Sequence, residues 1–197
     1  FVAVILTAVR GSFFGLIASF VVMTLLYVFS EVNLSFPKKF RTASIVVVAT
    51  MIAFVILIIS LSGSSFVQNN SYLRRLSDVS LKTKLIQTRF WAWGAGIDGW
   101  NDSAKTILVG WGPENFNVPF SVHFNPKFYN GPGAETLFDR AHNMFVEVLA
   151  TMGLLGFISY LGMFIVLFYA LWKIYHHSND TEYRLSSIIF AGMIVGY

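Results

Sequence analysis

A chain of 197 residues in which 55% are hydrophobic and only 12% are charged is too apolar for an ordinary soluble domain, where about 25% of residues carry a charge. Its formal net charge of +4 at pH 7 is not gathered into a basic stripe, which excludes a nucleic-acid partner, and the absence of cysteine excludes disulfides and thiol chemistry. Several apolar runs of about 20 residues indicate an integral membrane protein instead.

The first third of the chain alternates between apolar runs and short basic interruptions. Residues 1–9 predict the end of a truncated transmembrane helix, and Arg10 then interrupts the apolar run. Residues 12–30 and 42–61 predict two spanning helices, since each is long enough to cross a bilayer at about 1.5 Å per residue. The basic turn FPKKFR, at 36–41, separates them.

A long polar stretch, residues 62–142, precedes the apolar C-terminal part. Within it, residues 78–107 predict a helix with a rough apolar face, although three glycines weaken the pattern. Residues 143–172 are apolar again, 173–184 form a second short polar turn, and 185–197 predict the start of a last, truncated helix.

The sequence therefore predicts an all-α integral membrane protein, a transmembrane helix bundle with a large, partly helical extracytoplasmic loop. Its parts are residues 1–61, residues 62–142 and residues 143–197. Both short polar turns carry Lys and Arg, and the positive-inside rule places them in the cytoplasm. Region 62–142 and Arg10 then lie at the outer face.

Three side chains are candidates for chemistry. Arg10 stands in a run otherwise free of charge, where a guanidinium either has a function or extends to the membrane surface. Arg89 is either a solvated helix residue above aromatic rings or a ligand for an anion. His142 is either a structural hydrogen-bonding group or a base that takes a proton from a hydroxyl near neutral pH.

The neighbours of these residues carry further alternatives. Asn143 either caps the helix that follows or holds the imidazole of His142, and Arg140 lies two residues before that histidine. Asp98 and Asp102 are either two solvated carboxylates or, with less support, a pair of metal ligands. No His or Cys cluster has the spacing of a metal site.

Three motifs resemble motifs of the O-antigen ligase and polymerase superfamily, and they occur in the same order along the chain as in that family. They are TAVRGSFFGL at 7–16, RFWAWGAGIDGWNDSAKTILVGWGPENF at 89–116, and AHNMFVEVLATMGLLGFISYLGMF at 141–164. The last is similar to the family's signature of His-Asn followed by a Glu and two glycines. One departure is Val9, which stands where the family often has Ser before the arginine.

The resemblance implies transfer of a glycan from a polyprenyl diphosphate carrier to an acceptor hydroxyl. Arg10 and Arg89 would bind the diphosphate through paired charge-assisted hydrogen bonds, and His142 would be the base, with inversion at the anomeric carbon. Arg140, Asn143, Trp91 and Trp111 are the candidate substrate-binding residues, the tryptophans by stacking on sugars or resting on lipid. We expect no cofactor and no metal ion.

The implied partners are the lipid-linked glycan donor, a glycan or lipid acceptor, and membrane lipids. The implied location is the bacterial inner membrane, with the active site on the outer face and a role in lipopolysaccharide or other polysaccharide synthesis in the cell envelope. Ligase, polymerase and protein transferase stay open as alternatives. Two other classes are a transporter or flippase segment that moves the lipid, and a non-catalytic membrane scaffold.

Overall fold

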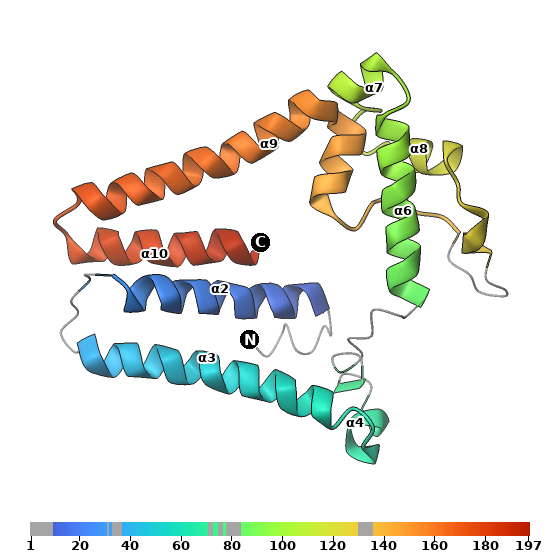
Figure 1. Ribbon diagram of the computed structural model, residues 1–197. Coiled ribbons are helices and arrows are strands. Elements are labelled where there is room, and N and C mark those ends of the chain that lie inside the picture. Colours follow the sequence, from blue (N-terminus) through green and yellow to red (C-terminus); the bar gives the residue numbers. More distant parts are fainter. Residues whose placement is uncertain are drawn as a thin grey trace. The chain divides into compact units, whose positions relative to one another are not determined.

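The computed structural model describes residues 10–30, 32, 37–70, 73, 74, 77, 84–129 and 136–197. These residues form helices and no strand, which confirms the predicted all-α membrane fold (Figure 1). The elements in chain order are α2 (Arg10–Val28), α3 (Pro37–Ser60), α4 (Ser65–Asn69), α6 (Lys84–Trp100), α7 (Ala104–Val109), α8 (Asn117–Val122), the 3₁₀ helix η1 (Pro126–Phe128), α9 (Met144–His177) and α10 (Thr181–Gly196).

Three helices within the described ranges are long and apolar enough to cross a membrane: Gly11–Val28, Lys38–Ser60 and Met144–His177. Each covers one of the apolar runs that predict a spanning helix. α2 begins at Arg10, the residue predicted to interrupt the first run. The truncated helix predicted over residues 1–9 lies outside the described residues.

The helix predicted over 78–107 is two helices in the structure, and residues 78–83 lie outside the described part. α6 ends at Trp100, and α7 starts anew after Ser103. The Ser103 hydroxyl accepts the N–H of Thr106 at 3.1 Å, while the Thr106 hydroxyl accepts the N–H of Ser103 at 2.9 Å. This reciprocal cap is a helix start signal with Thr in the place of the usual Glu or Gln, which makes it hard to recognise in a sequence.

The chain divides into two compact units, which we describe separately. The membrane unit comprises residues 1–79 and 167–197, and the loop unit comprises residues 80–166. α9 passes from the loop unit into the membrane unit. The three parts predicted from the sequence, with boundaries at 61/62 and 142/143, are defined by expected membrane boundaries and not by packing. That division stays a prediction.

In the membrane unit, α10 packs antiparallel against α2 through small residues. Gly15 of α2 lies against the backbone of Gly196, and Ser19, one turn later, lies against Gly192 and Gly196. A Cβ at Gly15 would come within 2.5 Å of the Gly196 carbonyl oxygen. Small residues four apart let two membrane helices approach closely enough for backbone contact, which stabilises helix pairs where lipid removes the hydrophobic driving force.

The two segments predicted as polar turns are largely helical: residues 37–41 begin α3, and only residues 178–180 separate α9 from α10. Both segments lie at the same end of the membrane unit. Tyr27, at the end of α2, belongs to one apolar cluster with Tyr175 of α9 and Ile188 of α10. Arg41, near the start of α3, donates to the Ser30 carbonyl at 2.8 Å, and Arg184, near the start of α10, packs over the Tyr175 ring of α9 at 5.8 Å. The two segments therefore lie on one side of this unit, and the side of the membrane that they face stays a prediction.

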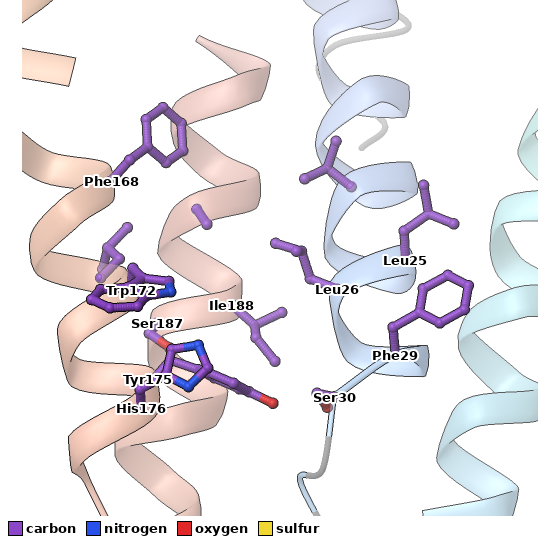
Figure 2. A pocket seen from close by; sticks show the side chains of 13 residues that line it. Leu25, Leu26, Phe29, Ser30, Phe168, Trp172, Tyr175, His176, Ser187 and Ile188 are labelled. Atoms are coloured by element: carbon purple, nitrogen blue, oxygen red, sulfur yellow. The ribbon is translucent and has the colours of Figure 1, made fainter. Parts of the chain in front are cut away.

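An apolar groove of about 600 Å³ lies between α2, α9 and α10 in the membrane unit (Figure 2). Leu26 of α2, Phe168 and Trp172 of α9, and Ile188 of α10 are among the residues that line it. Its walls expose mostly hydrocarbon, so the groove offers few groups that could take part in a reaction.

Candidate active site

The loop unit is built on a face of small residues along α6. Ala92, Ala95, Gly96 and Gly99 follow the spacing of a single helix face and are buried. A Cβ at Gly96 would come within 2.7 Å of the Phe116 ring, and one at Gly99 would meet Pro119 of α8. Two of the glycines that weaken the helix prediction are therefore the positions where α8 and the residue before it pack onto α6.

An aromatic core fills the space next to this face. Phe120, Phe128 and Phe138 lie with their ring centroids 5.2 to 5.5 Å apart, and all are at most 3% exposed. Ala141, with no exposed surface, belongs to the same cluster. This core fixes the segment 136–141, which leads directly to His142 and to the start of α9.

α9 is broken at Gly153, where the backbone has φ 65° and ψ −167°. The break leaves the carbonyls of the preceding turn without their helical partners. Backbone groups of the loop after α7 take their place: the Trp111 N–H donates to the Ala150 carbonyl at 3.1 Å, and the Gly112 N–H donates to the Thr151 carbonyl at 2.7 Å. The Gly-Trp-Gly-Pro motif, which starts at Gly110, therefore packs against the turn of α9 that leads into the Gly-x-x-Gly motif at Gly153.

Only glycine fits at the two positions that make this contact. Gly110 has φ 68°, and a Cβ there would meet the backbone of Thr151. Gly153 has φ 65°, and a Cβ there would meet the backbone of Leu108 and Val109 at about 2.5 Å. Positive φ and close backbone approach are the two situations in which glycine is required.

The start of α9 is held by its own polar residues. The Asn143 side-chain oxygen accepts the N–H groups of Phe145 at 3.0 Å and of Val146 at 3.4 Å, so it caps the helix. The Glu147 carboxylate turns back and accepts the N–H of Ala141 at 2.6 Å. Of the two alternatives for Asn143, the structure therefore has the cap.

His142 lies between these contacts, with its side chain exposed and its backbone at φ 53°, in the left-handed region. Its ring meets the edge of the buried Phe138 at a centroid distance of 6.0 Å. Ala141, the residue before it, accepts the indole N–H of Trp93 at its carbonyl, at 2.7 Å. The imidazole is thus exposed at the surface of the loop unit, while the backbone that carries it is held by hydrogen bonds.

Arg89 is exposed on α6, one helical turn before Trp93, so both side chains project from the same side of that helix. Since Trp93 contacts Ala141, this side of α6 faces the segment that carries His142. Arg10 belongs to the membrane unit, and its side chain lies outside the described part. A site shared by Arg10, Arg89 and His142 therefore stays a prediction.

The predicted substrate-binding residues have intramolecular contacts. Arg140 forms an exposed ion pair with Glu114 at 3.6 Å, which links the loop before α8 to the segment before His142. The Trp111 indole donates to the Gly99 carbonyl at 2.8 Å, and Trp91 meets the ring of Phe128 edge-on at 5.5 Å. Their proposed contacts with substrate stay predictions.

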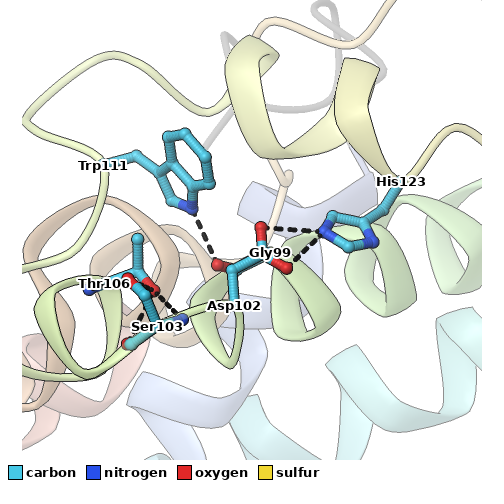
Figure 3. A network of polar contacts seen from close by, with 6 residues as sticks. All are labelled: Gly99, Asp102, Ser103, Thr106, Trp111 and His123. Carbon is cyan, nitrogen blue, oxygen red and sulfur yellow. Dashed lines mark hydrogen bonds and ion pairs between the residues drawn. The ribbon is translucent and has the colours of Figure 1, made fainter.

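One polar pair was missed by sequence reasoning. The Nε2–H of His123 donates to the carboxylate of Asp102, with Nε2 at 2.9 and 3.0 Å from its two oxygens (Figure 3). The pair ties the turn after α6 to the end of α8, next to the Trp111–Gly99 contact. Neither of the alternatives considered for Asp102 included His123, because nothing in a sequence links two residues at that separation.

Comparison with curated proteins and with solved structures found no match. The family model described as O-antigen ligase matches residues 1–161, which include α2, α3 and the loop unit up to and beyond the break in α9. The match covers the first two sequence motifs in full and the third as far as residue 161, and it includes Gly110, His142 and Gly153. The chain therefore belongs to the O-antigen ligase family, membrane glycosyltransferases of the ligase and polymerase type.

Proposed function

We propose that this protein transfers a glycan from a polyprenyl diphosphate carrier to an acceptor hydroxyl at the outer face of the bacterial inner membrane, with His142 as the general base. The observation that carries the proposal is the backbone conformation and the exposure of His142. A residue other than glycine is held at positive φ, with its imidazole exposed at the head of a helix. Such backbone conformations are costly and cluster at functional sites.

The proposed reaction is a single displacement at the anomeric carbon. The unprotonated imidazole of His142 takes the proton of the acceptor hydroxyl, and the hydroxyl oxygen forms a bond to the anomeric carbon. The bond between that carbon and the diphosphate oxygen breaks, and its electron pair leaves with the diphosphate. Attack on the face opposite the leaving group inverts the configuration.

The two arginines have the complementary role. Arg10 and Arg89 bind the diphosphate oxygens and stabilise the charge that grows on them as the bond breaks. A guanidinium suits this task because its planar array of donors matches a phosphate group. Two such groups supply the compensating charge, so we expect no requirement for a metal ion.

Four further residues of the loop unit are candidates for substrate binding. Arg140 and Asn143 flank His142 in the chain, and Trp91 and Trp111 lie in the aromatic segments around α6. We propose that they contact the sugars of donor or acceptor, in addition to the intramolecular contacts described above.

The proposal is tested with the purified full-length protein, a polyprenyl diphosphate glycan and a panel of acceptors. The panel contains lipid A core, a second lipid-linked repeat unit and a protein with free hydroxyls. We expect one acceptor to be glycosylated with inverted anomeric configuration, and a chelator to leave the rate unchanged.

Other outcomes contradict separate parts of the proposal. A chelator effect that a divalent cation reverses would contradict the role of the arginines as the only compensating charge. Movement of the donor across sealed vesicles without any covalent transfer would favour a transporter, and neither transfer nor movement would favour a scaffold.

A further inference from the structure

The backbone conformation of His142 needs an explanation of its own. A left-handed φ of 53° is unfavourable for a residue with a Cβ, and such a conformation persists only where the surrounding structure holds it. The side chain provides little of this restraint, because it is exposed and its ring touches only the edge of the Phe138 ring among the contacts found in the described residues.

Two hydrogen bonds hold the residue that precedes His142. The N–H of Ala141 donates to Oε2 of Glu147 at 2.6 Å, and the carbonyl of Ala141 accepts the Nε1–H of Trp93 at 2.7 Å. The carbonyl belongs to the peptide group that joins Ala141 to His142, so the Trp93 bond fixes the plane from which φ of His142 is measured. Ala141 itself is fully buried and has no freedom to shift.

The residue that follows His142 is held just as firmly. The side chain of Asn143 caps α9. The backbone carbonyl of Asn143 accepts the N–H of Glu147 at 2.9 Å, which is the first helical hydrogen bond. Glu147 therefore acts on both sides of His142, with its backbone after the histidine and its carboxylate before it. With both flanking residues fixed, the direction of the Cα–Cβ bond of His142 is fixed as well.

A histidine that acts as a base is commonly oriented by a hydrogen bond to its second ring nitrogen. No such bond to the His142 ring occurs among the described residues. The nearby carboxylate, Glu147, is used on a backbone N–H instead. Orientation through the backbone thus replaces orientation through the ring.

We propose that Glu147 and Trp93 are positioning residues of the transfer reaction, which aim the imidazole of His142 by holding the backbone of Ala141. The proposal rests on the proposed role of His142 as the base. Neither residue touches substrate in this scheme, so each acts on the rate of the chemical step rather than on donor binding.

The chemistry of the two bonds makes specific demands. Glu147 is needed as an acceptor and not as a charge, so Glu147→Gln, whose amide oxygen can accept the same N–H, should keep most of the activity. Glu147→Ala removes the acceptor. Trp93→Phe keeps an aromatic ring in the core but removes the indole donor.

The test measures kcat and the KM for donor in the full-length enzyme, together with thermal unfolding. We expect Glu147→Ala and Trp93→Phe each to lower kcat by about 10- to 100-fold, the effect of a small misplacement of a reacting group, with KM changed by less than about threefold. The matched control is Trp100→Phe. It removes an equivalent indole–carbonyl bond, from Trp100 to Ile107 at 3.1 Å, away from His142, and should leave kcat unchanged.

The outcomes separate this proposal from the one on which it rests. If His142→Ala is slow while Glu147→Ala and Trp93→Phe have wild-type kcat, the positioning role is wrong and the base role stands. If His142→Ala itself keeps wild-type activity, the base role fails and the positioning role falls with it. A Glu147→Gln enzyme as slow as Glu147→Ala, or a Trp100→Phe enzyme as slow as Trp93→Phe, would also overturn the proposal. So would failure of both Glu147→Ala and Trp93→Phe to accumulate in the membrane, because the residues would then be structural.

Discussion

The two units of the chain use glycine and tryptophan in different ways. In the membrane unit, Gly15 and Gly196 let two regular helices touch, and the helices stay intact. In the loop unit, Gly110 and Gly153 let two irregular segments touch, each with positive φ. Glycine thus serves as a spacer between helices in one unit and as a backbone joint in the other.

The tryptophans of the two units also make different kinds of contact. In the loop unit, the indoles of Trp93, Trp100 and Trp111 each donate to a main-chain carbonyl, so helix ends and the segments between helices are held at fixed points. In the membrane unit, Trp172 lines an apolar groove. The comparison suggests that the loop unit is built to hold backbone positions accurately, which is what a reaction site requires.

The largest effect that this comparison predicts is the loss of His142. His142→Ala should lower the transfer rate by roughly 100- to 10,000-fold, the usual contribution of a well-placed base. Insertion and donor binding should survive, because the side chain is exposed and, within the described part of the chain, its one ring contact is with Phe138. A correctly inserted His142→Ala enzyme at near wild-type rate would contradict the mechanism.

The next effect concerns the joint between the glycines of the loop unit. Gly153→Ala should destabilise the protein by about 1–3 kcal/mol, because alanine is strained at φ 65° and its methyl group meets the backbone of the Leu108–Val109 segment. Thermal unfolding in detergent measures this change. The control is Gly162→Ala in the same helix, where a Cβ meets nothing within 4 Å and should be neutral or slightly stabilising. Equal stability of the two variants would mean that the joint does not hold the unit.

The smallest effect is expected for a change that keeps charge but alters shape. Arg89→Lys should lower the rate by about tenfold, the value of one charge-assisted hydrogen bond, because a lysine lacks the planar fork. Lys105→Gln, which removes an exposed cation of the same unit, serves as the control and should have the wild-type rate. Kinetics at saturating donor measure both. Full activity of Arg89→Ala would remove this arginine from the mechanism.

Hydropathy was sufficient to predict the long apolar helices of the membrane unit, because a spanning helix is defined by a long apolar run and little else. It did not predict the short helix α4 or the start of α3 at Pro37. It was less informative for the loop unit, where α6 ends at Trp100 rather than continuing to residue 107. There the outcome depends on a serine–threonine cap and on contacts such as Trp93 with Ala141 and Asp102 with His123. These contacts join distant residues of common types, and a single sequence contains no sign of them.

The candidate site shows the same contrast. The motif around His142 marked the residue, and the cap by Asn143 was one of two alternatives that the sequence left open. The left-handed backbone of His142 was not predictable from the sequence. It depends on two hydrogen bonds to Ala141, one from its N–H to Glu147, later in the chain, and one to its carbonyl from Trp93, much earlier. Arg140 was expected only as a neighbour of the histidine, and its ion pair with Glu114 depends on the fold of the intervening loop.

The break at Gly153 also sets how much of α9 is available to match the hydrophobic thickness of a bilayer. At about 1.5 Å per residue, an unbroken helix of 34 residues would extend about 51 Å, well beyond a hydrocarbon layer of about 30 Å. Residues 154–177 alone extend about 36 Å, which a modest tilt accommodates. The carbonyls of Ala150 and Thr151, already bonded to the Trp111 and Gly112 N–H groups, need no water, so the helix can change direction close to lipid without exposing unpaired backbone groups to it.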